Sequence, residues 1–338
     1  MNEFQNPTIV LHSHPTGKAS IDNFRLEDRP VGELKEGEFL VENNFLSMDP
    51  YTRPRLNEYT AYVDPIKLGE AIQGETVGTV IDSRNPNYKV GDYVATFSGW
   101  QKYYISSDAD FLTKHLPETR LSISLFLTVA GTPGLAAYFG LRKIGKPKRG
   151  ETLVVSAASG AVGAVAGQLG KMAGCRVVGI AGTQEKCRYV VDVLGFDACI
   201  NYKEDNLAES IEMFCPDGVD IYFENVGGRV SSIVARYLNE GSRVPICGSA
   251  SLYDKDKDVD SATLSRFFSS LPSSPENRFF LVTEWMNESP EAVLWLVDAV
   301  EKGKIQFRET ITEGIENAPT AFINMLQGKH LGKALVHV

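Results

Sequence analysis

The chain has 338 residues, of which 43% are hydrophobic and 23% charged, and its formal net charge is −9. This balance is that of an ordinary globular protein, and the length predicts two domains rather than one. The negative charge argues against nucleic acid or an anionic membrane surface as the main partner, because clustered lysine and arginine chiefly hold both.

Targeting signals and cysteine usage indicate the compartment. Met1–Pro7 is polar with no apolar region after it, and no apolar stretch is as long as a membrane span. The five cysteines are odd in number and widely spaced, which favours free thiols over a disulfide framework. We therefore expect a cytoplasmic protein that neither crosses nor binds a membrane.

The first hundred residues have the pattern of short strands. Apolar runs at Phe39–Val41, Val77–Ile81 and Tyr93–Phe97 alternate with Gly-Asp, Asn-Pro and Gly-rich turns. This pattern predicts a compact, mostly antiparallel, barrel-like region.

The character changes near Leu121, where strands and helices begin to alternate. After a helix at Gly134–Leu141, the run Leu153–Ser156 is continuously apolar, as in a parallel strand covered on both faces. The expected order is then helix Val162–Met172, strand Arg176–Ile180, helix Glu185–Leu194, strand Ala198–Asn201, helix Leu207–Phe214, strand Val219–Phe223, helix Val230–Tyr237, strand Arg243–Cys247 and strand Arg278–Val282. Such alternation predicts an α/β fold with a doubly wound parallel sheet of the Rossmann type.

The last forty-eight residues depart from this alternation. They predict helix Glu291–Glu301, an extended segment Ile305–Thr310, helix Ala318–Leu326 and an extended end at Lys333–Val338. We expect the final strands to return to the first domain. The predicted domains are then 1–125 completed by 300–338, and 126–299.

One turn has the composition of a phosphate-binding loop. Ala157–Gly163 (Ala-Ala-Ser-Gly-Ala-Val-Gly) directly follows the first parallel strand and directly precedes its helix. Amides at a helix N-terminus bind pyrophosphate, Gly160 permits close approach, and Gly163 lets the helix pack on the strand. A tight small-residue turn without a ligand is the alternative.

The end of the second parallel strand indicates which dinucleotide binds. Enzymes that use NAD commonly place a carboxylate there for the ribose 2′-hydroxyl. This strand ends in Ala181-Gly182-Thr183, and Lys186 and Arg188 follow on the next turn. The pattern favours NADP(H).

A zinc site is not predicted. Zinc needs about three or four ligands from cysteine, histidine or acidic residues. Cysteine is absent before Cys175, and His12, His14 and His115 have no evident partner cluster in sequence.

The ordered motifs resemble the zinc-independent medium-chain dehydrogenase/reductase family, in the branch of the leukotriene/prostaglandin reductases and alkenal double-bond reductases. The resemblance covers nearly the whole chain. The motifs are Ser47–Tyr51, Ser98–Gln101, Pro133–Gly140, Ala157–Gly163, Gly167-Gln168, Glu185-Lys186, Gly195–Asp197, Asn201–Lys203, Asn225–Gly228, Ile246–Tyr253 and Leu331–Lys333.

This resemblance implies a GroES-like β-rich catalytic domain packed with a Rossmann domain, and NADPH-dependent reduction of the α,β double bond of conjugated aldehydes or ketones. It assigns residues to parts of the cofactor. The pyrophosphate falls to Gly160, Ala161, Val162 and Gly163; the adenosine phosphate to Lys186 and Tyr202; the middle of the cofactor to Asn225; and the nicotinamide to Cys247, Gly248, Ser249 and Tyr253 with Phe280, Leu281 and Val282. The family commonly has asparagine where this chain has His330, which would make the last cofactor contact.

Hydride addition to the β-carbon leaves negative charge on the carbonyl oxygen, which needs a hydrogen-bond donor and a proton. Tyr253 is our first candidate for this role and Tyr51, in the Asp-Pro-Tyr motif, the second; a ribose hydroxyl of the cofactor is a third. We expect a small hydrophobic enone or alkenal as substrate. The alternatives are a quinone reductase of the same superfamily and a non-catalytic NADPH-binding module. The sequence leaves open whether the chain forms a homodimer.

Overall fold

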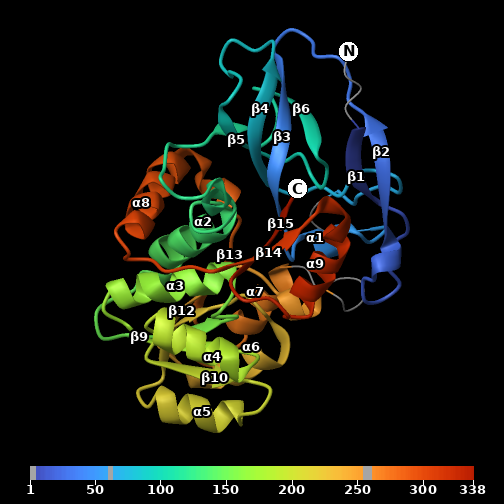
Figure 1. The fold of residues 1–338 in the computed structure, drawn as a ribbon. Coiled ribbons are helices and arrows are strands. Elements are labelled where there is room, and N and C mark those ends of the chain that lie inside the picture. Colours follow the sequence, from blue (N-terminus) through green and yellow to red (C-terminus); the bar gives the residue numbers. More distant parts are fainter. Residues whose placement is uncertain (1–4, 60–63, 254–260) are drawn as a thin grey trace. The chain divides into compact units, whose positions relative to one another are not determined.

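The computed structural model describes residues 5–59, 64–253 and 261–338. Contacts divide the chain into two compact units (Figure 1). The split unit comprises Met1–Leu127 and Glu309–Val338, and the parallel-sheet unit comprises Thr128–Arg308. The sequence-based boundaries are 125/126 and 299/300.

The split unit is built on strands from both ends of the chain, which pair antiparallel except for the parallel pair of β14 and β15. β1 (Gln5–Leu11) pairs with β2 (Phe24–Pro30). A second sheet has the order β14-β15-β3-β4-β5-β7, and β6 also pairs with β3. Its strands are β3 (Glu38–Ser47), β4 (Thr76–Ser83), β5 (Tyr93–Thr96), β6 (Tyr103–Ser107), β7 (Lys114–His115), β14 (Glu309–Glu313) and β15 (Lys333–His337). β15 pairs antiparallel with β3 through Leu335 and Ser47, so the chain's last strand completes this sheet.

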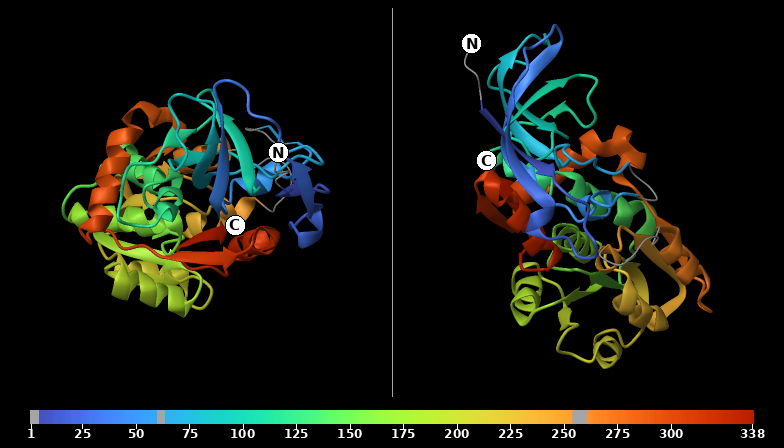
Figure 2. Two further views of the ribbon diagram at one scale, coloured as in Figure 1. Left: turned by 45° about the horizontal axis from the view of Figure 1, so that its top comes forward. Right: turned by 90° about the vertical axis from the view of Figure 1, so that its right-hand side faces the viewer.

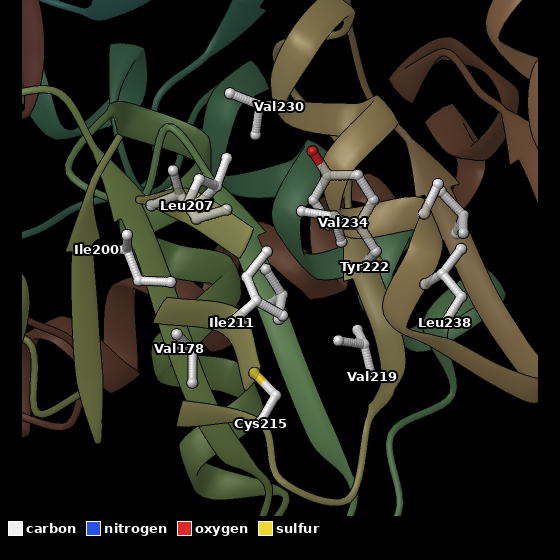
Figure 3. Close-up of a cluster of buried hydrophobic side chains, with 14 of the residues drawn as sticks. Val178, Ile200, Leu207, Ile211, Cys215, Val219, Tyr222, Val230, Val234 and Leu238 are labelled. Carbon is white, nitrogen blue, oxygen red and sulfur yellow. The ribbon is translucent and has the colours of Figure 1, made fainter. Parts of the chain in front are cut away.

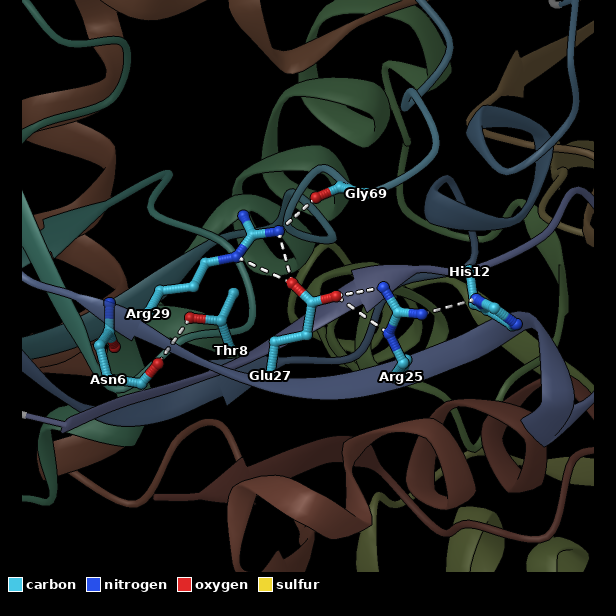
Figure 4. Close-up of polar contacts among 7 residues, drawn as sticks. All are labelled: Asn6, Thr8, His12, Arg25, Glu27, Arg29 and Gly69. Carbon is cyan, nitrogen blue, oxygen red and sulfur yellow. Dashed lines mark hydrogen bonds and ion pairs between the residues drawn. The ribbon is translucent and has the colours of Figure 1, made fainter.

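Two helices accompany these strands, α1 (Thr52–Arg55) and α9 (Ala318–Leu326). An aromatic cluster forms part of the core of this unit. The Trp100 ring stacks on Phe24 with 5.7 Å between ring centroids and meets Phe322 of α9 edge-on with 5.4 Å between centroids. The outer strand β2 instead carries exposed charges: Glu27 lies between Arg25 and Arg29 (Figure 4). Such exposed ion pairs contribute little to stability.

The parallel-sheet unit has the strand order β10-β9-β8-β11-β12-β13, and every neighbouring pair is parallel. Its strands are β8 (Thr152–Ser156), β9 (Arg176–Ala181), β10 (Ala198–Asn201), β11 (Val219–Phe223), β12 (Leu238–Ile246) and β13 (Glu276–Phe279). Its helices are α2 (Thr132–Phe139), α3 (Ala161–Met172), α4 (Gln184–Arg188), α5 (Leu207–Phe214), α6 (Gly228–Val234), α7 (Ser261–Ser269) and α8 (Ser289–Glu301). The order reverses between β8 and β11, which is the doubly wound topology that the sequence predicts.

Helices cover both faces of this sheet (Figures 1 and 2). Successive side chains along a strand point to opposite faces, so each face presents apolar side chains to its helices. Val154 and Val178 belong to the buried cluster that side chains of α5, α6 and α7 complete (Figure 3). Their neighbours Leu153 and Val177 point the other way, where Gly170 of α3 approaches them closely. Both faces are therefore buried, so the strands are continuously apolar.

Three predicted strands are wrong in their limits. The strand predicted at Arg243–Cys247 begins five residues earlier, as β12 at Leu238. The sequence predicts Arg278–Val282, but β13 spans Glu276–Phe279. Phe280 is 2% exposed and packs against Phe223, so its hydrophobicity serves the core rather than a strand. The extended segment predicted at Ile305–Thr310 begins later, as β14 at Glu309, because Ile305 is a buried residue of the parallel-sheet unit.

Helix Glu185–Leu194 is likewise not one regular helix. α4 ends at Arg188 and continues as a π-helix over Tyr189–Val193. Among the helices of the described residues, none is both long and apolar enough to cross a membrane.

Candidate cofactor site and active site

The turn after β8 has the geometry of a phosphate cradle. Ala157 takes a left-handed conformation (φ 50°) and its carbonyl accepts a hydrogen bond from the Gly160 amide at 2.9 Å. Helix α3 begins at Ala161, so its first amides have no carbonyl partner within the helix. A Cβ on Gly163 would collide with the Ala157 carbonyl oxygen, so glycine is required there.

The predicted adenosine-phosphate residues lie at the ends of β9 and β10, which are parallel neighbours. Gly182 follows β9 where an NAD enzyme would have its acid, and a Cβ there would lie 3.1 Å from Tyr202 and 3.4 Å from the Lys203 side chain. Lys186 is half-buried, and burial first and the charge of Lys203 second lower its pKa. The charges of Lys186 and Lys203 therefore lie near enough to affect each other, an arrangement that suits a phosphate dianion. Arg188 is exposed on α4.

Lys203 is a candidate that the sequence reasoning missed. Its side chain also lies over the Tyr202 ring at 6.0 Å. The available signal was its position directly after Tyr202, at the carboxyl end of the third parallel strand.

Asn225 lies where β11 ends and joins that strand to β8. Its side-chain amide donates to the Ser156 carbonyl at 2.7 Å, and its backbone amide donates to the Ser156 hydroxyl at 2.8 Å. Ser156 is buried, and it is a second residue that the sequence reasoning missed. Its place as the last residue of the phosphate-loop strand was the signal.

The segment Cys247–Tyr253 follows β12. The Tyr253 hydroxyl accepts a hydrogen bond from the Ser249 amide at 3.4 Å, which brings the phenol back over the loop beside Gly248. Burial first, and Glu224 second, raise the pKa of the Cys247 thiol to about 12.

The residues after β13 differ among themselves in exposure. Phe280 packs its ring among Phe223 and Trp285, and its amide donates to the Ile246 carbonyl at 3.3 Å, so the ring belongs to the core. Leu281 is 46% exposed, and Val282 begins a 3-10 turn.

Every predicted site residue of the parallel-sheet unit therefore follows the carboxyl end of a strand. Because the strands are parallel, these ends share one edge of the sheet, and the crevice at the reversal between β8 and β11 is where such folds bind ligands. Tyr51 and His330 belong to the split unit.

Tyr51 precedes α1, and its hydroxyl is buried without a hydrogen-bond partner among the described residues. Burial raises its pKa well above the usual value of 10.0, and the carboxylates of Asp49 and Glu75 add to this effect. Arg55 opposes it, and so does the Glu75 backbone, which lies near the phenol outside hydrogen-bonding geometry. Tyr51 is therefore a neutral phenol, able to donate its proton.

Asp49, in the same motif, is held by a buried ion pair. The Lys333 ammonium lies 2.5 Å from its carboxylate and also donates to the Met48 carbonyl at 2.9 Å. His330 precedes β15 in a half-buried turn, beside Leu331, whose amide donates to the Thr310 hydroxyl at 3.1 Å.

The structure separates the histidines that come early in the chain. His14 Nδ1 contacts the Leu56 carbonyl at 2.8 Å, whereas His12 Nδ1 contacts Arg25 at 3.4 Å (Figure 4). Within residues 5–59, 64–253 and 261–338, no three histidine, cysteine or acidic side chains are gathered as a metal ion would need.

Comparisons with known proteins agree with this architecture. A family profile described as the N-terminal domain of oxidoreductase matches residues 7–114, and one described as zinc-binding dehydrogenase matches residues 161–271. The chain is 42% identical over 350 residues to the NADPH-dependent curcumin reductase of Escherichia coli K12, covering 99% of this chain and 97% of that protein. It is 41% identical over 328 residues to prostaglandin reductase 1 of Oryctolagus cuniculus, covering 96% and 90%.

A solved structure is similarly close. The crystal structure of CurA from Vibrio vulnificus in complex with NADPH superposes with a TM-score of 0.91 at 40% identity, covering 98% of this chain and 99% of that one. Similarity of this extent, over both units and at this level of identity, establishes kinship. The chain belongs to the medium-chain dehydrogenase/reductase family, in the branch of the curcumin and prostaglandin reductases.

Proposed function

We propose that this protein is an NADPH-dependent reductase that saturates the α,β carbon–carbon double bond of conjugated aldehydes or ketones. The observation that carries the proposal is the carboxyl edge of the parallel sheet, where the phosphate cradle follows β8 and the neighbouring Lys186 and Lys203 follow β9 and β10. The relatives support it, since one is an NADPH-dependent curcumin reductase and another was crystallised with NADPH.

The residues present fit this cofactor. The Cβ-free position Gly163 and the left-handed Ala157 leave the first amides of α3 open to a pyrophosphate, and Lys186 with Lys203 would hold the 2′-phosphate. Asn225 and the Cys247–Tyr253 segment would hold the nicotinamide half. NADPH supplies the hydride that adds to the β-carbon of the substrate.

The protein then has to stabilise and protonate the resulting enolate oxygen. Tyr253 is our first candidate donor, because the Ser249 amide holds its hydroxyl oxygen beside Gly248, in the loop assigned to the nicotinamide. Tyr51 is the second, since its raised pKa keeps the phenol protonated at every physiological pH.

Replacing Tyr253 by phenylalanine tests the first assignment. We expect kcat to fall by about 100-fold, the usual size of a lost general acid, while the Kd for NADPH changes little. Tyr59→Phe, at an exposed tyrosine, is the matched control. Full turnover in Tyr253→Phe would move the role to Tyr51 or to the cofactor's ribose hydroxyl.

The activity itself is tested by following NADPH oxidation against a panel of enones, alkenals, quinones and saturated carbonyls, with product masses and spectra identifying the reduced bond. We expect enones and alkenals to yield saturated carbonyl products. An alcohol product would contradict the double-bond assignment. Turnover of quinones alone would indicate a quinone reductase, and binding without turnover would indicate a non-catalytic module.

The proposal includes a small hydrophobic substrate and a cytoplasmic location. Sedimentation velocity would establish whether the chain forms the homodimer that the sequence leaves open.

A further inference from the structure

Glu224 is a carboxylic acid with no exposed surface, immediately after β11. Its backbone amide donates to the Pro245 carbonyl of β12 at 3.0 Å, and its carbonyl accepts from the Cys247 amide at 2.8 Å. Because β11 lies between β8 and β12, Glu224 occupies the middle of the carboxyl edge where the predicted cofactor residues gather.

The side chain of Glu224 is surrounded by neutral hydrogen-bond donors. Its Oε1 accepts from the Val226 amide at 2.7 Å and the Gly227 amide at 3.0 Å, and it lies 3.2 Å from the hydroxyls of Ser156 and Tyr222, while Oε2 accepts from the Ser231 hydroxyl. Backbone amides can only donate, so a carboxylate that only accepts matches this environment. These donors offset the large cost of burying the charge.

The carboxylate fixes the conformation of the turn that follows it. Gly227 and Gly228 are both left-handed, with φ of 76° and 64°, and this conformation turns the amides of Val226 and Gly227 toward one oxygen. Without the Glu224 side chain, these two amides would lose the oxygen on which they converge, and a neutral side chain would offer them a weaker acceptor.

This turn in turn holds the neighbouring loop. The Asn225 carbonyl accepts from the Ala250 amide at 3.1 Å, and the Val226 carbonyl accepts from the Ser251 amide at 2.9 Å. That loop carries Tyr253. One buried charge is thus connected, through two layers of hydrogen bonds, to both segments assigned to the nicotinamide half of the cofactor.

We propose that Glu224 is a positioning residue whose buried charge holds the 225–228 turn, and through it the 247–253 loop, in the shape that receives the nicotinamide half of NADPH. The inference rests on the proposed function, because that proposal supplies the cofactor and the roles of the two segments.

The test compares two ligands on the full chain. NADPH reaches both halves of the site, whereas adenosine 2′,5′-bisphosphate carries the 2′-phosphate but has no nicotinamide. In Glu224→Gln, which places an amide NH2 among donors, we expect the Kd for NADPH to rise about tenfold or more and the Kd for the bisphosphate to change less than about twofold. Isothermal titration calorimetry gives both constants.

Two further variants sharpen the test. Glu224→Asp keeps the charge and should recover part of the NADPH affinity, whereas Glu240→Gln, which removes an exposed charge from β12, should leave both constants unchanged. If Glu224→Gln raised the Kd of both ligands equally, the role of Glu224 would be merely structural and the proposal would fail. An unchanged Kd for NADPH would also overturn it.

If Glu224→Gln does not fold, Ser231→Ala decides the question, because it removes a single donor to Oε2. A selective rise in the NADPH Kd of Ser231→Ala supports the proposal, and an unchanged ratio of the two constants overturns it. Neither constant depends on turnover, so a failure of the double-bond reductase activity would be recognised separately, in the wild-type protein.

Discussion

At the scale of single residues, we propose that the pair Lys186 and Lys203 gives the site its preference for NADPH. Burial first and the charge of Lys203 second lower the pKa of Lys186, so an anion bound beside both ammonium groups would relieve the repulsion between them. In Lys203→Ala we expect the Kd for NADPH to rise about tenfold and the Kd for NADH to change little, as measured by cofactor fluorescence.

The same pair has a pH dependence with a definite sign. Lys186 loses its proton at a lower pH than an ordinary lysine, so NADPH affinity falls as the pH rises through that lowered pKa. Removing the Lys203 charge should move this loss to higher pH. Lys302→Ala, at an exposed lysine of the parallel-sheet unit paired with Asp298, is the control. An equal loss of NADPH and NADH binding would contradict the assignment.

Burial protects the Cys247 thiol from reaction with electrophiles. With a pKa of about 12, only about one thiol in ten thousand is ionised at pH 8, and the thiolate is the nucleophile. We expect iodoacetamide to leave Cys247 unmodified in the native protein and to label it after denaturation, as read by peptide mass spectrometry. Rapid native labelling would show that the loop opens.

At the scale of elements, regular periodicity decided what the sequence could predict. The strands β8 and β9 contain continuous apolar runs because both sheet faces are covered there, so their positions follow from composition. The edge strand β13 alternates exposed and half-buried residues, and the buried Phe280 beyond it shifted the predicted limits. Lys203 had only its position after Tyr202 as a signal, and Glu224 could not be recognised because several of its hydrogen-bond partners come from another strand and from the turn that follows it.

Helix α3 gives a prediction at this scale. Alanine in place of a helical glycine usually stabilises, by about 1 kcal/mol. At Gly167, however, a Cβ would penetrate the ring of buried Phe196. We therefore expect Gly167→Ala to lower the free energy of unfolding by about 1–3 kcal/mol, measured by urea denaturation.

A double-mutant cycle isolates this contact. In a Phe196→Leu background the smaller side chain leaves room, so the cost of Gly167→Ala should shrink. The same cost in both backgrounds would place its origin elsewhere in the helix.

At the scale of the whole molecule, the buried pair of Lys333 and Asp49 connects the two ends of the split unit. The side chains are 4% and 9% exposed. Lys333→Met would leave Asp49 charged and unpaired, so we expect the free energy of unfolding to fall by about 3–5 kcal/mol in urea denaturation. The double variant Asp49→Asn/Lys333→Met should lose less free energy of unfolding than the two single variants lose in sum.

The strand order of the split unit also determines when its sheet can be completed during synthesis. A ribosome delivers the contiguous segment Thr128–Arg308 before it delivers β15, whose partner β3 was made nearly three hundred residues earlier. The nascent chain therefore carries an open strand edge at β3 until translation passes His337, and open edges invite aggregation. Premature release near residue 308 would yield a folded Rossmann unit tethered to an unfinished sheet, a natural substrate for chaperones.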